Sequence, residues 1–376
     1  MLGGWWHKAR CPIGIDLGEH SVKAVQLHTL RSHLRVRAAA SAAMPHDTPP
    51  AHEGYHQAVQ DTLARLLEQG AFAGRRVVVG LPASVVQFKN LRLPKMPPGE
   101  LPAAVEWEAR QHLEPDQQPV EIQFFDAGEV RQGQEVRQEV ILMTASSPFI
   151  EAHLQMLARL GLEPVALEVA PSALMRSARA WAGPEGDELR VVIDVGYAFS
   201  KVLIGRGQRV LFFKLIDIAG RHWDEAVAQQ LKLPRHEAGE VRRRLGREAS
   251  QDPAEADQTP RSRSQEEAQQ AVQDAVRPLL HELAREASLC LRYYGVTFRG
   301  QRPQQIALTG GESRQPGLAQ ALAQQIGVEV RTGAEALTPE LSEAATQALR
   351  EHPAAWAAAM GLSLRDALDQ AKRRAA

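Results

Sequence analysis

The chain has 376 residues, which exceeds the size of an ordinary single core and predicts two lobes with a cleft between them. Its 44% hydrophobic residues, 24% charged residues and net charge of −1 are typical of a globular protein and argue against a nucleic-acid partner, because no excess positive charge attracts polyanions. The two cysteines, Cys11 and Cys290, are far apart in the sequence, which argues against a disulfide framework and a zinc site and favours a reducing compartment.

The hydropathy pattern argues against a membrane-spanning or exported chain. No stretch approaches the roughly 20 apolar residues that cross a bilayer, and the first ten residues hold no apolar run long enough for a secretory signal. Trp5 and Trp6 stand beside basic residues at the N-terminus, where contact with a membrane surface is one alternative. We expect them instead to pack on the domain or lie disordered, and we expect a cytoplasmic protein.

The first elements in chain order are two strands, a helix and a strand. Cys11–Leu27 is predicted to form a hairpin, in which an apolar strand, a tight turn at Gly18 and a second strand follow one another. Helical spacing of apolar residues predicts a helix over Tyr55–Gln69, which ends before Gly70. Val77–Leu81 has the composition of a buried strand.

The next segment has the character of an insertion. Ser84–Gly128 contains a proline cluster, a helical pattern around Leu101–Leu113 and a strand-like run at Val120–Phe125, which together predict a small inserted subdomain. The remaining elements predicted for this half are a strand at Val140–Ala145 and helices at Phe149–Leu160 and Pro171–Ala182.

The opening pattern returns in the second half. Arg190–Phe213 is predicted as a strand, a turn at Gly196 and two further strands. We expect Gly246–Gln265 to be a mobile loop, because it is charged and has few large apolar residues, and Ala271–Tyr294 to be a long helix interrupted near Pro278. A strand at Gln304–Thr309 and a helix at Pro316–Ile326 complete the pattern. The alternation predicts an α/β protein with mixed sheets.

Two of these hairpins share a spacing that suits a nucleotide. Asp16 and Gly18 in the first, and Asp194 and Gly196 in the second, form D-x-G motifs. Glycine lets the backbone approach phosphate oxygens closely. A carboxylate that ends a buried strand is costly unless it is paired or serves a cation, and Mg²⁺ beside phosphates is commonly held by one or two carboxylates, largely through water. A single D-x-G motif is weak evidence, because strands commonly end in Asp and Gly. Two such motifs, followed by Gly310-Gly311, where an adenine and its ribose could lie against the backbone, predict a cleft for a magnesium nucleotide.

Longer stretches around these motifs carry a family resemblance. They are GIDLGEHSVKAVQL (Gly14–Leu27), VVIDVGYAFSKVLI (Val191–Ile204), LFFKLIDIAGRHWDEAV (Leu211–Val227), ALTGGESRQPGL (Ala307–Leu318) and PAAWAAAMGLSLR (Pro353–Arg365). The order D-x-G, D-x-G, G-G is similar to that of the actin/Hsp70/sugar-kinase group, and nearly the whole chain resembles the PilM family of type IV pilus assembly proteins. Val77–Pro115 resembles the start of the inserted subdomain shared with the division protein FtsA.

The resemblance implies a fold and a division of the chain. It implies an α/β, actin/Hsp70-like two-lobed ATPase fold of two ribonuclease-H-like domains, with an FtsA-type inserted subdomain. The first lobe is expected at 1–188, with the insertion at about 84–148 and a C-terminal return at 345–376. The second lobe is expected at 189–344, with a helical and mobile subdomain at about 234–299.

The resemblance also implies site residues. Asp16 and Asp194 would serve Mg²⁺, largely through water, and Glu168 is a candidate for orienting the attacking water. The residues expected to bind the nucleotide are Asp16, Gly18, Ser21, Lys23, Asp194, Gly196, Ser200, Gly220, Gly310, Gly311 and Glu312. Two of these candidates have a plain alternative: Lys23 as a solvated strand lysine, and Glu168 as an acidic residue near a helix start.

Both cleft turns depart from the family pattern. Glu19 and His20 stand where the family usually has small hydroxyl residues, and Glu19 would repel phosphate if it pointed inward. Tyr197 and Phe199 flank the tip of the second turn and are expected to narrow the cleft. We therefore expect ATP binding with at most weak ATPase activity.

The run Arg242–Arg244 is interpreted as a solvated helix face.

The function implied by the resemblance is an ATP-binding cytoplasmic adaptor of type IV pilus assembly. Its partner would be the N-terminal cytoplasmic peptide of PilN, received near Ser84–Gly128, since an extended peptide can add to a preformed groove or sheet edge. PilN would connect it to the PilO/PilP complex, hold it at the inner membrane and link that complex to the pilus motor ATPases. Two alternatives stay open: a small-molecule kinase of the same fold, although no acidic motif clearly supplies its base, and an FtsA-like filament-forming protein, although the sequence shows no terminal linker and amphipathic helix.

Overall fold

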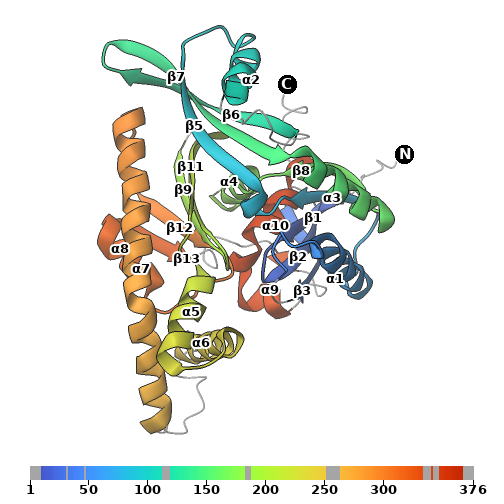
Figure 1. Cartoon of the computed structure of the whole chain (residues 1–376), viewed down its shortest axis with the longest axis vertical. Coiled ribbons are helices and arrows are strands. Elements are labelled where there is room, and N and C mark those ends of the chain that lie inside the picture. Colours follow the sequence, from blue (N-terminus) through green and yellow to red (C-terminus); the bar gives the residue numbers. More distant parts are fainter. Residues whose placement is uncertain are drawn as a thin grey trace, which may run out of the picture.

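The computed structural model describes residues 10–30, 33–45, 48–111, 119–182, 188–250, 263–332, 340–341 and 347–366. These ranges form three β-sheets with helices packed on them (Figure 1). Trp5, Trp6 and residues 251–262 of the expected mobile loop lie outside them. Among the helices of these ranges, none combines the length and apolar character of a membrane span.

The first lobe is built on a six-stranded sheet of order β14-β3-β2-β1-β4-β8. Strands β1, β2 and β3 form an antiparallel meander, and β4 and β8 continue the sheet in parallel. The apolar residues of β1 are buried because helices α1 and α3 cover one face of the sheet and α10, Ala357–Ser363, covers the other. The bounds are β1 Arg10–Leu17, β2 Ser21–Leu30, β3 His33–Ala43, β4 Arg76–Gly80, β8 Glu163–Glu168, β14 Glu340–Leu341, α1 Tyr55–Gln69 and α3 Ser147–Arg159.

The second lobe repeats this arrangement in a five-stranded sheet of order β11-β10-β9-β12-β13. Strands β9, β10 and β11 form the meander, and β12 and β13 run parallel to β9, as β4 and β8 do to β1. The repeated opening pattern of the sequence is therefore a repeated sheet topology. The bounds are β9 Leu189–Val195, β10 Ser200–Arg206, β11 Arg209–Ile216, β12 Gln305–Thr309 and β13 Glu329–Thr332.

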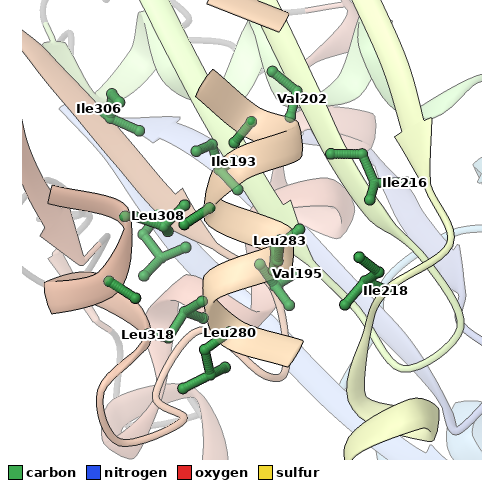
Figure 2. Close-up of a cluster of buried hydrophobic side chains, with 14 of the residues drawn as sticks. Ile193, Val195, Val202, Ile216, Ile218, Leu280, Leu283, Ile306, Leu308 and Leu318 are labelled. Carbon is green, nitrogen blue, oxygen red and sulfur yellow. The ribbon is translucent and has the colours of Figure 1, made fainter. Parts of the chain in front are cut away.

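Helix α7, Arg263–Phe298, organises the core of the second lobe. It is the long helix along one side of the molecule in Figure 1. Figure 2 shows Leu280 and Leu283 of α7 among the side chains of β9, β10 and β12. The expected interruption near Pro278 is wrong, because the helix is continuous over 36 residues and contains this proline. Packing on the sheet at both sides of Pro278 holds the helix together where an isolated one would tend to break.

The remaining helices of the second lobe are α5 Gly220–Leu231, α6 Arg235–Ser250 and α8 Leu318–Ile326. Helix α6 contacts α5, and α5 contacts α7. Residues 246–250 of the expected loop are thus the last part of α6, since Leu245 and its neighbours pack into the core of the lobe.

A separate three-stranded antiparallel sheet, order β5-β7-β6, follows β4. It consists of β5 Val86–Pro94, β6 Val120–Gln132 and β7 Glu135–Ser146, and helix α2 Leu101–Gln111 packs on it. The sheet stands at one end of the molecule (Figure 1). A buried polar contact ties it to α7: Glu139 is 1% exposed and accepts hydrogen bonds from Arg92 Nε at 2.8 Å and Tyr293 Oη at 2.8 Å.

The end of the described chain returns to the first lobe. Strand β14 joins β3, and α9 Gln347–Glu351, the 3₁₀ turn Pro353–Trp356 and α10 Ala357–Ser363 follow. Helix α10 packs against β1 and against α4, Ala170–Ala182. A Cβ on Gly361 would lie 1.8 Å from the Ala173 carbonyl oxygen, so only glycine allows α10 and α4 to approach this closely. This contact explains the small residues and the Gly-Leu pair of the closing motif.

Candidate functional site

Both predicted turns line one cleft between the lobes, with a volume of about 1060 Å³. Their tips meet across it, since the rings of His20 and Tyr197 have centroids 5.0 Å apart. Nine of the predicted residues line this cleft: Asp16, Gly18, Ser21, Lys23, Asp194, Gly196, Gly310, Gly311 and Glu312. Motifs separated by more than a hundred residues in the sequence therefore face one shared space.

The two hairpins are equivalent in register. Asp16 lies opposite Lys23 on β2, and Asp194 lies opposite Lys201 on β10. Lys201 also lines the cleft, although the sequence analysis did not select it. The signal was present, because Lys201 follows Asp194 by the same seven positions that separate Lys23 from Asp16.

Asp194 is bonded on both carboxylate oxygens. Lys201 Nζ donates to Oδ2 at 2.7 Å, and Thr309 Oγ1 donates to Oδ1 at 3.0 Å. Thr309 ends β12, directly beside Asp194 in the parallel pairing. Burial by itself lowers the pKa of Lys201, but the carboxylates of Asp194, Asp16 and Glu19 together outweigh burial, and the pKa lies above its ordinary value. Lys201 is therefore held as an ammonium ion, and the ion pair is nearly closed to solvent, with Asp194 4% exposed.

Asp16 has a different environment. Its partner on β4 is Gly80, which has no side chain to donate a hydrogen bond. Lys23 Nζ donates to Ser21 Oγ at 3.0 Å, and within the described ranges no side chain donates to the Asp16 carboxylate. Burial raises the pKa of Asp16, against the effects of Lys23 and Lys201, which lower it. This carboxylate is the one that remains available to a ligand in the cleft.

These donors fit nucleotide phosphates better than they fit a metal bound at both aspartates. Two ammonium groups and two glycine turns suit phosphate oxygens. A divalent ion could approach Asp16, but direct ligation by Asp194 would first have to displace Lys201. Among the described residues, no group of three or more His, Cys, Asp or Glu side chains is placed to hold a metal.

The Gly310-Gly311 turn is attached to the second hairpin. Gly310 has a φ of +98°, and a Cβ on it would lie 2.2 Å from the Val195 carbonyl oxygen. The same oxygen accepts a hydrogen bond from the Glu312 N–H at 3.0 Å. A Cβ on Gly311 would meet nothing within 4 Å, so this glycine faces open space in the cleft. Such a bare backbone surface suits a flat ring.

Glu312 lines the cleft, and its carboxylate is engaged in a buried ionic network. Arg242 Nη1 donates to Glu312 at 2.9 Å, and Arg242 Nε donates to Asp224 of α5 at 2.7 Å. Burial would raise the pKa of Glu312, but Arg242 and Arg243 outweigh it and the pKa lies below its ordinary value. The interpretation of this arginine run as a solvated face is wrong for Arg242, which is 2% exposed because its side of α6 faces α5 and the glycine turn.

Three predicted residues do not line the cleft. Ser200 is fully buried and donates to the Ile218 carbonyl at 2.5 Å, and the Gly220 N–H donates to the Gly196 carbonyl at 3.2 Å. Both support the second hairpin from behind. Glu168 is the last residue of β8, not part of a helix, and its carboxylate forms ion pairs with Arg176 and Arg365.

The cleft contains further residues that the sequence analysis assigned differently or did not select. His352, just before the 3₁₀ turn, has Nε2 3.0 Å from Ser313 Oγ; burial, with Arg314 nearby, lowers its pKa to about 3. Glu19 points into the cleft region, and burial raises its pKa while a hydrogen bond from Ser84 opposes the shift. Arg243 and Arg244 also line the wall. No local signal marks His352, because the fold alone brings the chain end to this place.

Comparison with known proteins decides the family. The model of the family described as type IV pilus assembly protein PilM matches residues 14–367. The chain belongs to the PilM family. A solved chain from a structure titled as the PilM–PilN type IV pilus biogenesis complex has 27% sequence identity and a TM-score of 0.72, covering 94% of this chain and 98% of that one.

Two more distant structures share the fold of this PilM family member. The ethanolamine utilization protein EutJ from Carboxydothermus hydrogenoformans has 15% identity and a TM-score of 0.54, covering 95% of this chain and 89% of its own. MreB5 of Spiroplasma citri, solved with AMPPNP, has 10% identity and a TM-score of 0.52, covering 98% and 100%. The expected actin-like two-lobed fold is confirmed.

Proposed function

We propose that this PilM family protein is a nucleotide-dependent adaptor of type IV pilus assembly, which binds ATP in the cleft and the N-terminal cytoplasmic peptide of PilN on another surface. The observation that carries the proposal is the convergence of both D-x-G turns and the glycine pair on one cleft. Closure of the two lobes on the nucleotide would change the surfaces that a partner contacts.

The nucleotide part rests on the donor set. Lys23 and Lys201 supply positive charge from the two lobes, Gly18 and Gly196 leave the turns narrow, and Gly311 leaves a bare surface for adenosine. Mg²⁺ would accompany the phosphates near Asp16, largely through its own water molecules.

We expect slow hydrolysis. Both oxygens of Glu168 are engaged by arginines, so this carboxylate is not free to accept a proton from water. The rings of His20 and Tyr197, at the tips of the two turns, meet across the cleft and narrow it, whereas small hydroxyl residues would leave space there. The nucleotide would thus act as a conformational ligand more than as a substrate.

The partner part rests on the family and on the inserted sheet. The solved family relative is a complex with PilN. In this chain β5 and β6 are the outer strands of the three-stranded sheet, and within the described residues neither pairs with a further strand. Strand β6 lies against β11, so β5 is the edge that could accept an extended peptide. Trp107 on α2 is 63% exposed and offers a large apolar contact beside this sheet. Binding to PilN would hold the protein at the cytoplasmic face of the inner membrane and connect it to PilO/PilP and the motor ATPases.

The proposed division of the chain follows the sheets. We place the first lobe at 1–188, with the insertion at about 84–148 and a return at 345–376, and the second lobe at 189–344, with its helical subdomain at about 234–299. Packing of α10 on β1 supports the return. The pairing of β14 with β3 moves its start to residue 340 or earlier, because Glu340 and Leu341 already belong to the sheet of the first lobe.

Calorimetry tests the nucleotide part. Wild type should bind ATP with Mg²⁺, and Asp16→Ala and Asp194→Ala should each weaken it by about tenfold or more, because both turns serve one ligand. Absence of ATP binding at millimolar concentration would refute the proposal.

The partner part is tested with a labelled PilN N-terminal peptide and a phosphate-release assay in the same samples. We expect peptide binding that depends on ATP, with little phosphate released. Trp107→Ala should weaken peptide binding, whereas Leu154→Ala, at an exposed apolar residue on α3, serves as the control. Rapid phosphate transfer to a metabolite would favour a kinase instead.

A further inference from the structure

Lys201 is not among the site residues expected from the sequence, yet it lies at the centre of the cleft. It lies on β10 at the wall of the cleft, and its side chain is only 17% exposed. Its Nζ is 2.7 Å from Asp194 Oδ2. A full positive charge therefore already lies against the carboxylate that was expected to serve the metal.

The surrounding charges place this ammonium between the lobes. Besides Asp194, the carboxylates that act on Lys201 are Asp16 and Glu19, both on the first hairpin. Lys23, its equivalent by register, bonds Ser21 instead of an aspartate. The second hairpin thus contributes a cation that faces the acidic groups of both lobes.

An ammonium group has three N–H donors, and Asp194 uses one of them. The others remain for phosphate oxygens without loss of the Asp194 bond. Placing a divalent ion directly on Asp194, in contrast, would leave the buried lysine without its partner, which is strongly unfavourable.

We propose that Lys201 is a nucleotide-binding residue that supplies, between Asp194 and the phosphates, the positive charge that a divalent cation would otherwise supply there. Nucleotide binding in this chain then depends only weakly on Mg²⁺. The inference rests on the proposed function, since it assigns a role within the same cleft.

The test compares ATP affinity by calorimetry in excess Mg²⁺ and in EDTA. For wild type, the two dissociation constants should agree within about threefold, because the ammonium is present in both buffers. For Lys201→Met, affinity in EDTA should fall by about tenfold or more and Mg²⁺ should restore part of it, since Asp194 is then free to serve the ion. Lys214→Met, a lysine on β11 paired with Glu286 outside the cleft, is the matched control and should behave as wild type.

Lys201→Arg keeps the charge and covers the case in which Lys201→Met does not fold; it should retain the weak Mg²⁺ dependence. If wild type binds ATP about thirtyfold or more tightly in Mg²⁺ than in EDTA, the role of Lys201 is overturned while nucleotide binding stands. An unchanged Mg²⁺ dependence in a folded Lys201→Met would do the same. If wild type binds no ATP in either buffer, the proposed function itself fails.

Discussion

The two cleft hairpins have the same spacing and the same strand neighbours, but their aspartates are treated differently. In the second lobe, Asp194 is closed off by Lys201 and Thr309. In the first lobe, Gly80 occupies the position beside Asp16 that Thr309 occupies beside Asp194, and Lys23 donates a hydrogen bond to Ser21 instead of to the aspartate. Two contacts, from Thr309 on the parallel strand and Lys201 on the antiparallel strand, thus separate a structural carboxylate from one that is available to a ligand.

This difference teaches that a repeated motif does not imply a repeated role. The second hairpin is an internally satisfied element that holds its lysine in place, whereas the first is satisfied only when something enters the cleft. Three measurements would break or sharpen this contrast.

The largest effect is expected for Asp194→Ala on the free energy of unfolding. The variant leaves the ammonium of Lys201 buried without its partner, which should cost about 3–5 kcal/mol. Asp16→Ala removes a carboxylate with no bonded donor and should change stability by less than about 1 kcal/mol. Urea unfolding without nucleotide, in EDTA at pH 7, measures both. Equal losses would contradict the contrast, and the double variant Asp194→Ala, Lys201→Met should recover part of the first loss.

A smaller effect should distinguish the lobes by pH. The first lobe contains His153 on α3, fully buried with no hydrogen-bond partner on either ring nitrogen, and burial, with His56 nearby, lowers its pKa to about 4. Because the unfolded pKa of about 6.5 is higher, the unfolded state binds more protons between these values, and stability is lost as pH falls through that window. Of the second-lobe histidines His222, His236 and His281, none is buried.

The variant His153→Phe removes the imidazole and therefore its contribution to the pH dependence of stability. From pH 7 to pH 5, wild type should lose about 2 kcal/mol more stability than the variant does, as read from urea unfolding at each pH. His236→Gln, an exposed histidine on α6, is the control and should keep the wild-type slope. The same slope in His153→Phe and wild type would show that the buried ring does not govern the acid response.

The smallest effect is expected for Thr309→Val, which keeps the side-chain shape and removes the donor to Asp194 Oδ1. Loss of a buried hydrogen bond to a charged group should cost about 1.5 kcal/mol in thermal or urea unfolding. Thr309→Ser retains the hydroxyl and should keep a larger share of the stability. A neutral Thr309→Val would mean that Lys201 alone satisfies Asp194.

Much of the first sheet was open to prediction because its signals are local. The helix Tyr55–Gln69 begins and ends where apolar periodicity and Gly70 place it. Strand β3 was not predicted, since its alanines and arginines lack the apolar alternation of a typical strand and it is held by pairing with β2. Strand β5 was likewise not predicted, because its exposed polar residues resemble a loop until β7 pairs with it.

The sequence by itself determined the hairpins, their Asp-to-Lys spacing and their repetition, because strand register across a tight turn depends only on nearby residues. Only the tertiary structure decided which groups each aspartate meets, that Arg242 is buried against Glu312, and that Glu168 is occupied by two arginines. Apart from Arg176, which lies eight positions from Glu168, these partners come from segments 70 to 197 positions apart. Their contacts arise from the packing of whole sheets and helices, for which a short stretch of sequence carries no local signal.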